Sequence, residues 1–228
     1  MEQLIFELAT TEPPSFANFV AGANREAVTA LMLAASGGGR ETGTVIWGPP
    51  GAGKSHLMRA TVAAAEAAVR EARFAAAPAE VGDWADAALV AVDAIDQADS
   101  AAQARLFSLY NALRDRGAHL VAAGSRPPGR MALRDDLRTR LGWGLIFEIQ
   151  PLGDADKPAA LTAYARQRGF GLSDDVIAYL LAHGRRDMPS LVATLAALDR
   201  HSLAVKRAVT VPLLREWLQR EMGLGPPQ

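Results

Sequence analysis

The sequence predicts an α/β fold in which a parallel five-stranded sheet carries a phosphate-binding loop and a small all-α domain follows. Three observations predict it. Short apolar segments alternate with helical segments as far as Pro151, the pattern GPPGAGKS directly follows one of these segments at 48–55, and strand signals nearly stop after Pro151. Short apolar strands separated by helices are typical of a parallel sheet that helices cover on both faces.

Turn and capping residues bound the elements of the first domain. We expect Asn24 to cap a helix at 25–35, which ends before three consecutive glycines. The apolar runs predict strands at 44–47, 73–76, 89–93, 120–123 and 145–149, and longer helices at 54–71 and 101–116.

The segment after Pro151 predicts three or four amphipathic helices. They are expected at about 155–169, 174–183, 188–203 and 212–222, with N-caps at Asp154, Ser173, Asp187 and Thr210. We therefore divide the chain into a flexible arm at 1–14, an α/β nucleotide-binding domain at 15–151, a helical lid at 152–222 and a tail at 223–228.

Composition excludes several classes of protein. Half of the 228 residues are hydrophobic, which is enough for a full core, and 24 Lys plus Arg balance 25 Asp plus Glu. The net charge therefore offers no long-range attraction to nucleic acid or to a membrane. The absence of Cys rules out thiolate chemistry, and neither a secretory signal nor an apolar stretch of about 20 residues is present. We expect a cytoplasmic protein.

The pattern GPPGAGKS has every fixed position of a P-loop, follows a predicted strand and opens a predicted helix. Its glycines allow backbone N–H groups to approach phosphate oxygens, Lys54 reaches the β and γ phosphates, and Ser55 is placed to bind Mg²⁺. The nucleotide-binding residues predicted here are Gly48, Pro49, Pro50, Gly51, Ala52, Gly53, Lys54, Ser55 and His56.

The strand LVAVD ends in Asp93, which we expect to lie beside the P-loop and to hold Mg²⁺ together with Ser55. A second carboxylate usually follows directly and activates the attacking water, but Ala94 occupies that position here. A positioned general base contributes roughly 10² to 10⁴ in rate, so hydrolysis by this chain alone is predicted to be weak. Whether Asp96 replaces the missing base stays open at this stage.

Several motifs in order resemble the AAA+ core of the bacterial replication initiator DnaA, from about residue 15 to residue 221. They are SFANFVAGANREAV, GPPGAGKSHL, the strand ending in Asp93, AAGSRPP and RTRLGWGL. The length and the N-terminal arm most resemble the Hda family, DnaA-related proteins that inactivate the initiator by stimulating hydrolysis of its bound ATP. The resemblance implies no DNA-binding domain after the lid, hence no direct sequence-specific DNA binding, and it implies DnaA as a partner.

The resemblance also implies roles around the nucleotide. Phe19, Val20 and Ala21 would line the adenine pocket with Phe16 packing behind them, although Phe16 fits an ordinary core role equally well. Ser125 takes the sensor position at the end of the fourth strand.

In the lid, RRDMPSL resembles the second sensor segment of the family. Pro189 stands where an Arg would reach the γ-phosphate, so sensing of that phosphate is predicted to be weakened. Whether Arg185 or Arg186 compensates stays open. The nucleotide we expect is ADP, with ATP as the alternative.

Arg140, in RTRLGWGL, matches the arginine finger of the family, which reaches the nucleotide of a neighbouring subunit. A finger supplied in trans contributes roughly 10³ to 10⁵ in phosphoryl-transfer rate. The competing interpretation is that Arg140 is one solvated charge beside Arg134 and Arg138. The resemblance favours the finger, and with it a chain that acts on a partner's ATP.

The N-terminal arm is similar to the short peptides that dock on the bacterial sliding clamp, although Phe6 and Glu7 depart from their commonest form. A Gln amide would set the register while apolar anchors fill a pocket. The candidate clamp-binding residues are Gln3, Leu4, Ile5, Phe6 and Leu8. The alternative is a strand whose apolar side chains pack on the body.

The resemblance therefore implies a negative regulator of replication initiation that works on the DNA-loaded clamp. It also allows a homo-oligomer, although the sequence does not fix the oligomeric state. Two alternatives stay open. One is a self-sufficient ATPase such as a DnaC-like helicase loader, and the other is a non-catalytic nucleotide-binding adaptor.

Overall fold

The computed structural model describes residues 13–221. They fall into two compact units, one formed by residues 14–152 and the other containing the helices from residue 153 onward. Each unit is described by itself below.

The first unit is built on five parallel strands in the order β2-β3-β4-β1-β5. The strands are β1 (Gly43–Trp47), β2 (Ala72–Ala75), β3 (Leu89–Val92), β4 (His119–Gly124) and β5 (Leu145–Glu148). The predicted five-stranded parallel sheet is therefore confirmed. Because all the strands run the same way, their carboxyl ends meet at one edge of the sheet.

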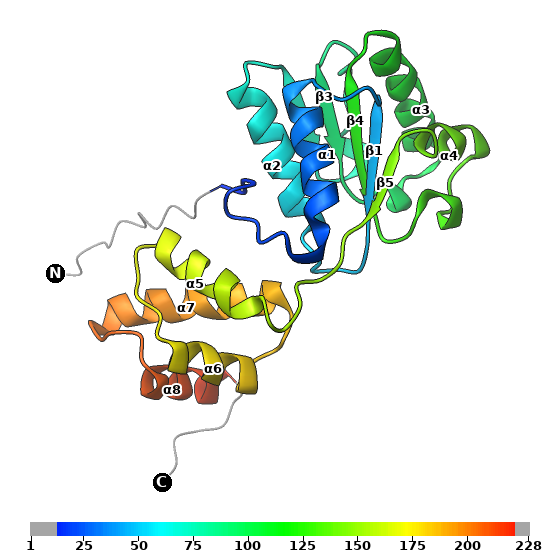
Figure 1. Ribbon diagram of the computed structural model, residues 1–228. Coiled ribbons are helices and arrows are strands. Elements are labelled where there is room, and N and C mark those ends of the chain that lie inside the picture. Colours follow the sequence, from blue (N-terminus) through cyan, green and yellow to red (C-terminus); the bar gives the residue numbers. More distant parts are fainter. Residues whose placement is uncertain (1–12, 222–228) are drawn as a thin grey trace, which may run out of the picture. The chain divides into compact units, whose positions relative to one another are not determined.

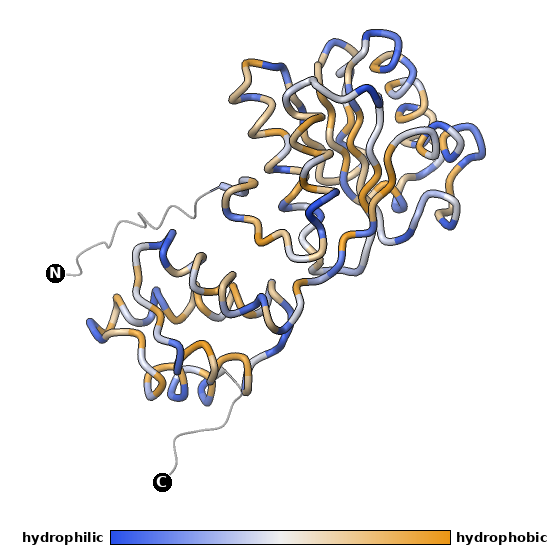
Figure 2. Tube along the Cα trace, in the orientation of Figure 1, coloured by the Kyte–Doolittle hydropathy of each residue, from blue (hydrophilic) through white to orange (hydrophobic). Residues whose placement is uncertain are grey.

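Helices cover both faces of this sheet (Figure 1). They are α1 (Arg25–Ser36) and α2 (Lys54–Ala67) on one face, and α3 (Ser100–Asp115) and α4 (Asp135–Leu141) on the other. The unit also contains the short 3₁₀ turns η1 (Gly22–Asn24), η2 (Pro78–Glu80), η3 (Ile95–Gln97) and η4 (Pro128–Arg130). Successive side chains of a strand point to opposite faces. Accordingly Leu89 and Ala91 belong to the core under α1 and α2, and Val90 and Val92 to the core under α3 and α4. Figure 2 shows much of the sheet in apolar colours.

Asn24 does not cap α1 with its side chain, so that expectation is wrong. The side chain is buried, and its amide exchanges two hydrogen bonds with the backbone of Gln150. Asn24 Nδ2 donates to the Gln150 carbonyl at 2.9 Å, and the Gln150 N–H donates to Asn24 Oδ1 at 2.8 Å. The Asn24 side chain therefore bonds to a distant residue instead of capping its own helix. These hydrogen bonds connect the start of α1 to the segment just after β5.

The helix predicted at 54–71 ends earlier, at Ala67. Val69 has a φ of 57°, which a helix cannot accommodate. The chain then turns so that the Arg70 guanidinium donates to the Ala34 and Ala35 carbonyls, both at 2.8 Å. These carbonyls belong to the last turn of α1, so Arg70 supplies hydrogen bonds that the helix end lacks.

The sequence pattern did not predict α4, which has only seven residues. A buried side chain outside the helix fixes its start: Gln103 Oε1 accepts a hydrogen bond from the Arg134 N–H at 2.7 Å, and Gln103 Nε2 donates to the Ala98 carbonyl at 2.8 Å. The position of α4 therefore depends on α3.

The second unit contains four helices around a Leu-rich core: α5 (Lys157–Gln167), α6 (Asp174–His183), α7 (Met188–Val205) and α8 (Val211–Glu221). The caps predicted at Ser173 and Asp187 are confirmed, because their side chains accept hydrogen bonds from the Val176 and Ser190 N–H groups. Asp154 is not a cap. The N-cap of α5 is Asp156, and the Asp154 carboxylate instead pairs with Lys157 Nζ at 2.6 Å.

Within the described residues, no helix combines the length and the apolar character needed to cross a membrane.

Candidate functional site

The loop between β1 and α2 lies at the carboxyl edge of the sheet and has the backbone form that its glycines predict. Gly48, Gly51 and Gly53 have φ values of 155°, 79° and 98°, which side-chain-bearing residues rarely adopt. A Cβ atom on Gly48 would lie 2.3 Å from the Ile149 carbonyl oxygen. The loop therefore has this shape only with glycine at these positions.

Lys54, the first residue of α2, turns its ammonium back over the loop. Its Nζ atom donates to the carbonyls of Gly48 at 2.7 Å and Pro49 at 2.9 Å. Burial lowers the pKa of Lys54, while the nearby Asp93 and Asp96 carboxylates raise it. The ammonium thus lies between the loop backbone and two acidic side chains.

Ser55 and Asp93 are brought into direct contact, as the sequence predicted. Ser55 Oγ donates to Asp93 Oδ2 at 2.5 Å, and the Ala94 N–H holds Asp93 Oδ1 at 2.8 Å. A hydroxyl and a carboxylate are hard oxygen ligands of the type that Mg²⁺ takes from proteins, usually with phosphate oxygens and waters completing the octahedron. The pair fits a nucleotide-bound Mg²⁺, and no group of three or more His, Cys, Asp or Glu side chains in residues 13–221 forms a metal site of its own.

Asp96 also faces the site, a placement that the sequence left open. Ala94 has a φ of 51°, and η3 follows directly, so the chain turns sharply after β3. The Asp96 carboxylate then accepts hydrogen bonds from both the hydroxyl and the N–H of Ser125, the residue that follows β4. The predicted sensor residue and the second carboxylate are therefore one hydrogen-bonded pair.

The segment before α1 reaches the P-loop through Phe19. A Cβ on Gly53 would lie 2.7 Å from the Phe19 ring, whose centroid is 5.4 Å from that of His56. His56 Nε2 lies 3.0 Å from the Ser15 carbonyl oxygen, and burial lowers the pKa of His56 while this backbone contact raises it. Phe16 and Phe19 both pack on the core under α1 and α2.

Of the proposed adenine pocket, Phe19 is thus in contact with the P-loop residues. Val20 and Ala21 follow it in the same segment and are both half-buried.

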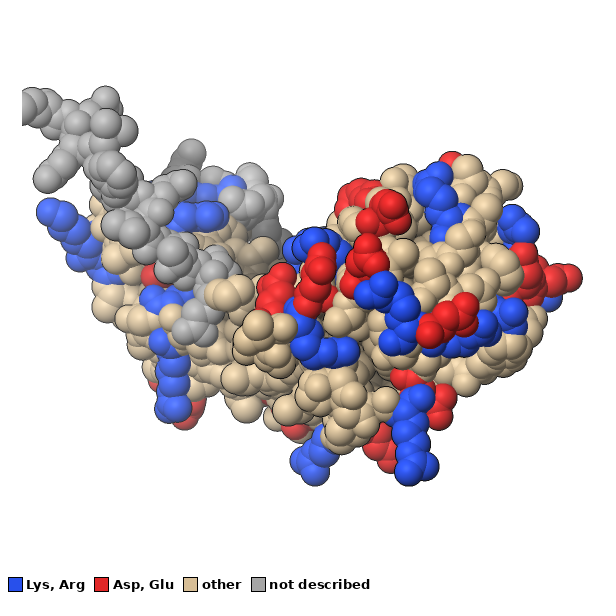
Figure 3. Space-filling view, turned by 90° about the horizontal axis from the view of Figure 1, so that it is seen from above, with Lys and Arg blue, Asp and Glu red and all other residues tan. Residues whose placement is uncertain are grey.

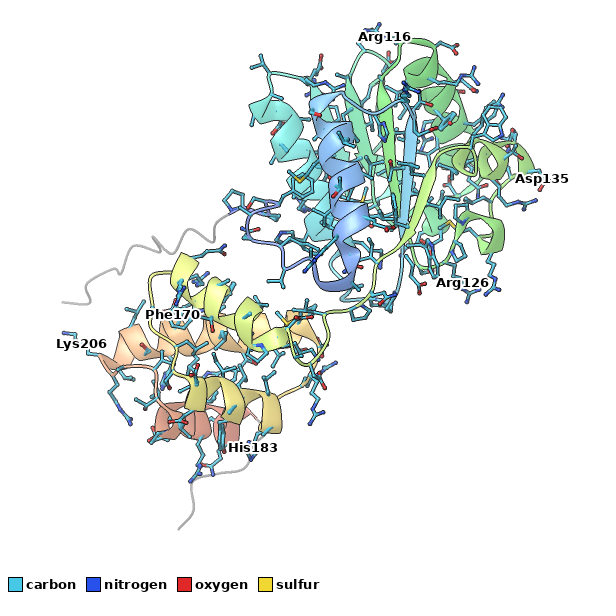
Figure 4. All side chains as sticks on the ribbon, in the orientation of Figure 1. Arg116, Arg126, Asp135, Phe170, His183 and Lys206 are labelled. Atoms are coloured by element: carbon cyan, nitrogen blue, oxygen red, sulfur yellow. The ribbon has the colours of Figure 1, made fainter. Side chains whose placement is uncertain are left out.

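Arg140 differs from the other arginines of α4. Arg134 and Arg138 pair with Asp136 and Asp135 at 2.7 Å and 2.5 Å, whereas no ion pair involves Arg140 in the described part of the chain. Figure 4 places Asp135 on the outer side of this helix. The two arginines are therefore held by carboxylates of their own helix, and Arg140 is not.

Aromatic rings and an amide hold Arg140 instead. Its Cζ atom lies 4.0 Å from the Trp143 ring centroid and 5.7 Å from that of Phe107, and its Nε donates to Asn111 Oδ1 at 3.1 Å. The sequence analysis did not identify Trp143, Asn111 or Phe107 as partners of Arg140. Within the described residues, neutral groups thus position the Arg140 guanidinium and no carboxylate pairs with it.

The surface beside Arg140 is apolar and exposed. Trp143 is 54% exposed, and Leu145 and Ile146 of the edge strand β5 are 38% and 42% exposed. Exposed edge strands with apolar side chains are favoured sites for contact with another chain.

The remaining predicted residues lie elsewhere. Pro189 is in the first turn of α7, where proline is tolerated, and Arg185 and Arg186 in the preceding loop are paired with Asp187 and Asp154. The clamp-binding residues Gln3, Leu4, Ile5, Phe6 and Leu8 lie outside the described residues. On the face seen in Figure 3, acidic and basic side chains are interspersed rather than gathered in one patch.

Comparison with known proteins gave a family match for the second unit and similar solved structures for most of the chain. Residues 154–218 match the family described as the lid domain of Hda. Domain III of the replication initiation protein DnaA from Thermotoga maritima superposes with a TM-score of 0.80 at 18% identity, covering 90% of this chain and 95% of that one.

AMPPCP-bound DnaA from Aquifex aeolicus gives a TM-score of 0.70 at 19% identity over 82% of this chain and 65% of that one, so this chain spans just under two thirds of that initiator. The RuvB Holliday junction branch migration motor of T. maritima gives a TM-score of 0.67 at 20% identity, covering 90% of this chain and 70% of that one. These likenesses show the AAA+ fold that the motifs predicted.

Proposed function

Because this chain is an Hda-like, DnaA-related AAA+ protein, we propose that it is a negative regulator of replication initiation that stimulates hydrolysis of DnaA-bound ATP. In this proposal Arg140 enters the ATP site of DnaA from the neighbouring position, as an arginine finger supplied in trans. The observation that carries the proposal is the state of Arg140, which is held by Trp143 and Asn111 and has no carboxylate partner in the described part of the chain.

The apolar strip formed by Trp143, Leu145 and Ile146 supports the same assignment. A finger acts only when two subunits pack closely around the nucleotide, and burial of apolar side chains is the main favourable term in such packing. The strip begins at Trp143, in the connection between α4 and β5, three residues after Arg140 near the end of α4. Docking through it would bring the guanidinium to the partner.

We propose that the P-loop of this chain itself holds ADP and Mg²⁺. Lys54 and the loop amides would bind the β-phosphate, Ser55 and Asp93 would hold the Mg²⁺, and Phe19, Val20 and Ala21 would contact the adenine. The metal would neutralise phosphate charge. The AMPPCP bound to A. aeolicus DnaA supports nucleotide binding in this fold. The nucleotide would shape the protein, and the ATP that is hydrolysed would be the partner's.

The proposal is tested by preloading DnaA with labelled ATP and following its hydrolysis with this protein and DNA-loaded sliding clamp. Hydrolysis should accelerate only when both are present, and this protein alone should turn over ATP slowly. Rapid turnover without DnaA would favour a self-sufficient ATPase, and unchanged hydrolysis in the complete mixture would refute the proposal.

We further propose that the arm at 1–14 binds the clamp. Replacing Gln3 and Leu4 together by Ala is expected to abolish retention of the protein on a clamp column, because the register-setting amide and one apolar anchor are lost together. Replacement of Glu2 and Thr10 by Ala provides the matched control, since neither is an anchor in the proposed motif. Undiminished retention of the Gln3/Leu4 variant would rule out the arm as the clamp-binding segment.

A further inference from the structure

The pair formed by Asp96 and Ser125 is an unassigned feature of the nucleotide site. The Ser125 N–H donates to Asp96 Oδ2 at 3.2 Å, and the Ser125 hydroxyl donates to the same oxygen. Both donors of this sensor residue are therefore committed to a carboxylate of the same domain. A phosphate oxygen that uses the Ser125 hydroxyl has to compete with Asp96 for it.

The carboxylate lies close to the first residue of the P-loop. Gly124 pairs with Trp47 in the sheet, and its carbonyl accepts a hydrogen bond from the Gly48 N–H at 3.3 Å. A Cβ on Gly124 would lie 3.3 Å from Asp96 Oδ1. Gly124, the last residue of β4, thus lies between Asp96 and the P-loop. The negative charge of Asp96 raises the pKa of the Lys54 ammonium.

Two carboxylates, Asp93 and Asp96, therefore face the one ammonium that the P-loop provides. Asp93 is bonded to Ser55 and is placed to hold Mg²⁺, so its charge is offset when the metal is bound. Among the described residues, Asp96 accepts hydrogen bonds from the neutral donors of Ser125, and it shares the Lys54 ammonium with Asp93. A third phosphate would add further negative charge to a site where a single ammonium already faces two carboxylates.

Arg126 is the positive side chain next to this pair in the sequence. Arg126 follows Ser125 directly, but its side chain is exposed and Figure 4 shows it at the outer edge of the domain. An exposed guanidinium is screened by water and salt, whereas the two donors of Ser125 hold the carboxylate in one position.

We propose that Asp96, held by Ser125, makes this P-loop selective for a nucleoside diphosphate over the corresponding triphosphate. The proposal rests on the nucleotide binding proposed above and names the residue that decides which nucleotide stays bound. Asp96 acts here as a fixed negative charge rather than as a base that activates water. It is therefore a specificity-determining residue of the site.

The test is the ratio of the dissociation constants for ADP and a non-hydrolysable ATP analogue, both with Mg²⁺, measured on the full chain by displacement of a fluorescent ADP. Asp96→Asn removes the charge and retains an oxygen that accepts from Ser125. We expect the analogue to bind about tenfold more tightly to this variant, equivalent to ~1.4 kcal/mol, while ADP affinity stays within about twofold.

Asp86→Asn is the matched control. Asp86 pairs with Arg116 at 2.7 Å, and Figure 4 shows Arg116 at the end of the sheet opposite to Arg126. This substitution changes the net charge by the same amount and should leave the ratio unchanged.

An unchanged ratio in Asp96→Asn overturns this inference alone, and so does an equal shift in Asp86→Asn. Loss of ATP hydrolysis in Asp96→Asn with unchanged analogue affinity would make Asp96 a general base and would also overturn it. A wild-type protein that binds neither nucleotide would remove the nucleotide-binding premise as well. The proposed role of Arg140 as an arginine finger would still be tested separately, by measuring hydrolysis of DnaA-bound ATP.

Discussion

Replacing Arg140 by Ala is expected to return hydrolysis of DnaA-bound ATP to its unstimulated rate, a loss of roughly 10³ to 10⁵ if the finger supplies the usual contribution. The guanidinium would otherwise lie beside the charge that develops on the transferred phosphoryl group, where the interaction is stronger in the transition state than in the ground state. The measurement is single-turnover hydrolysis of labelled ATP preloaded on DnaA, with saturating clamp-bound DNA and increasing amounts of the variant.

Arg138→Ala is the matched control, because Arg138 lies on the same helix and is paired with Asp135 at 2.5 Å. It should retain stimulation close to that of wild type. Arg140→Lys keeps the charge but loses the planar donors, and we expect it to recover only a small part of the rate. Full stimulation by Arg140→Ala would eliminate the finger and favour an adaptor that only brings the clamp and DnaA together.

The second large effect is expected from His119, which is buried between β1 and β4. Its Nε2 atom lies 2.9 Å from Thr44 Oγ1. Burial lowers the pKa of His119 to about 4, opposed by a hydrogen bond with the Glu41 backbone and reinforced by the positive charge of Arg70. The imidazole is therefore neutral in the folded protein at any pH above that value.

The sign of the pH dependence follows from this shift. The unfolded chain takes up a proton at His119 near pH 6.5, whereas the folded chain does so only near pH 4, so stability is lost as the pH falls through that window. The loss is about 3 kcal/mol across the window and about 2 kcal/mol by pH 5.

Urea unfolding at pH 7.5 and pH 5, followed by tryptophan fluorescence, measures the effect. Three of the four tryptophans, Trp47, Trp84 and Trp143, lie in the unit that contains His119. Between these two pH values, the free energy of unfolding should fall by about 2 kcal/mol less in His119→Gln than in wild type. His183 is exposed, and His183→Gln is the control variant, whose free energy of unfolding should fall by as much as that of wild type. Equal losses in all three proteins would show that another group controls acid stability.

Local patterns were enough to predict the elements on which the site depends. The five strands and the P-loop follow from runs of apolar residues and from glycines whose φ values side chains disfavour. Both signals act over a few residues, so one sequence displays them. The capping of α6 by Ser173 and of α7 by Asp187 has the same local origin.

Contacts between distant residues could not be predicted in the same way. Asn24 is of a residue type that often caps helices, yet its side chain hydrogen-bonds to the backbone of Gln150 instead. The spacing of Asp96 from Asp93 did not indicate that the turn at Ala94 would direct it to Ser125, 29 residues further along the chain. The short α4 likewise depends on Gln103 rather than on its own periodicity.

The exchange of hydrogen bonds between Asn24 and Gln150 also constrains the order of folding. The two residues are 126 positions apart, so closing the loop between them is entropically costly until the intervening strands have assembled. During synthesis, Asn24 leaves the ribosome long before Gln150 does. The hydrogen bonds that fix Asn24, at the start of α1, can therefore form only after the segment that follows β5 has been synthesised.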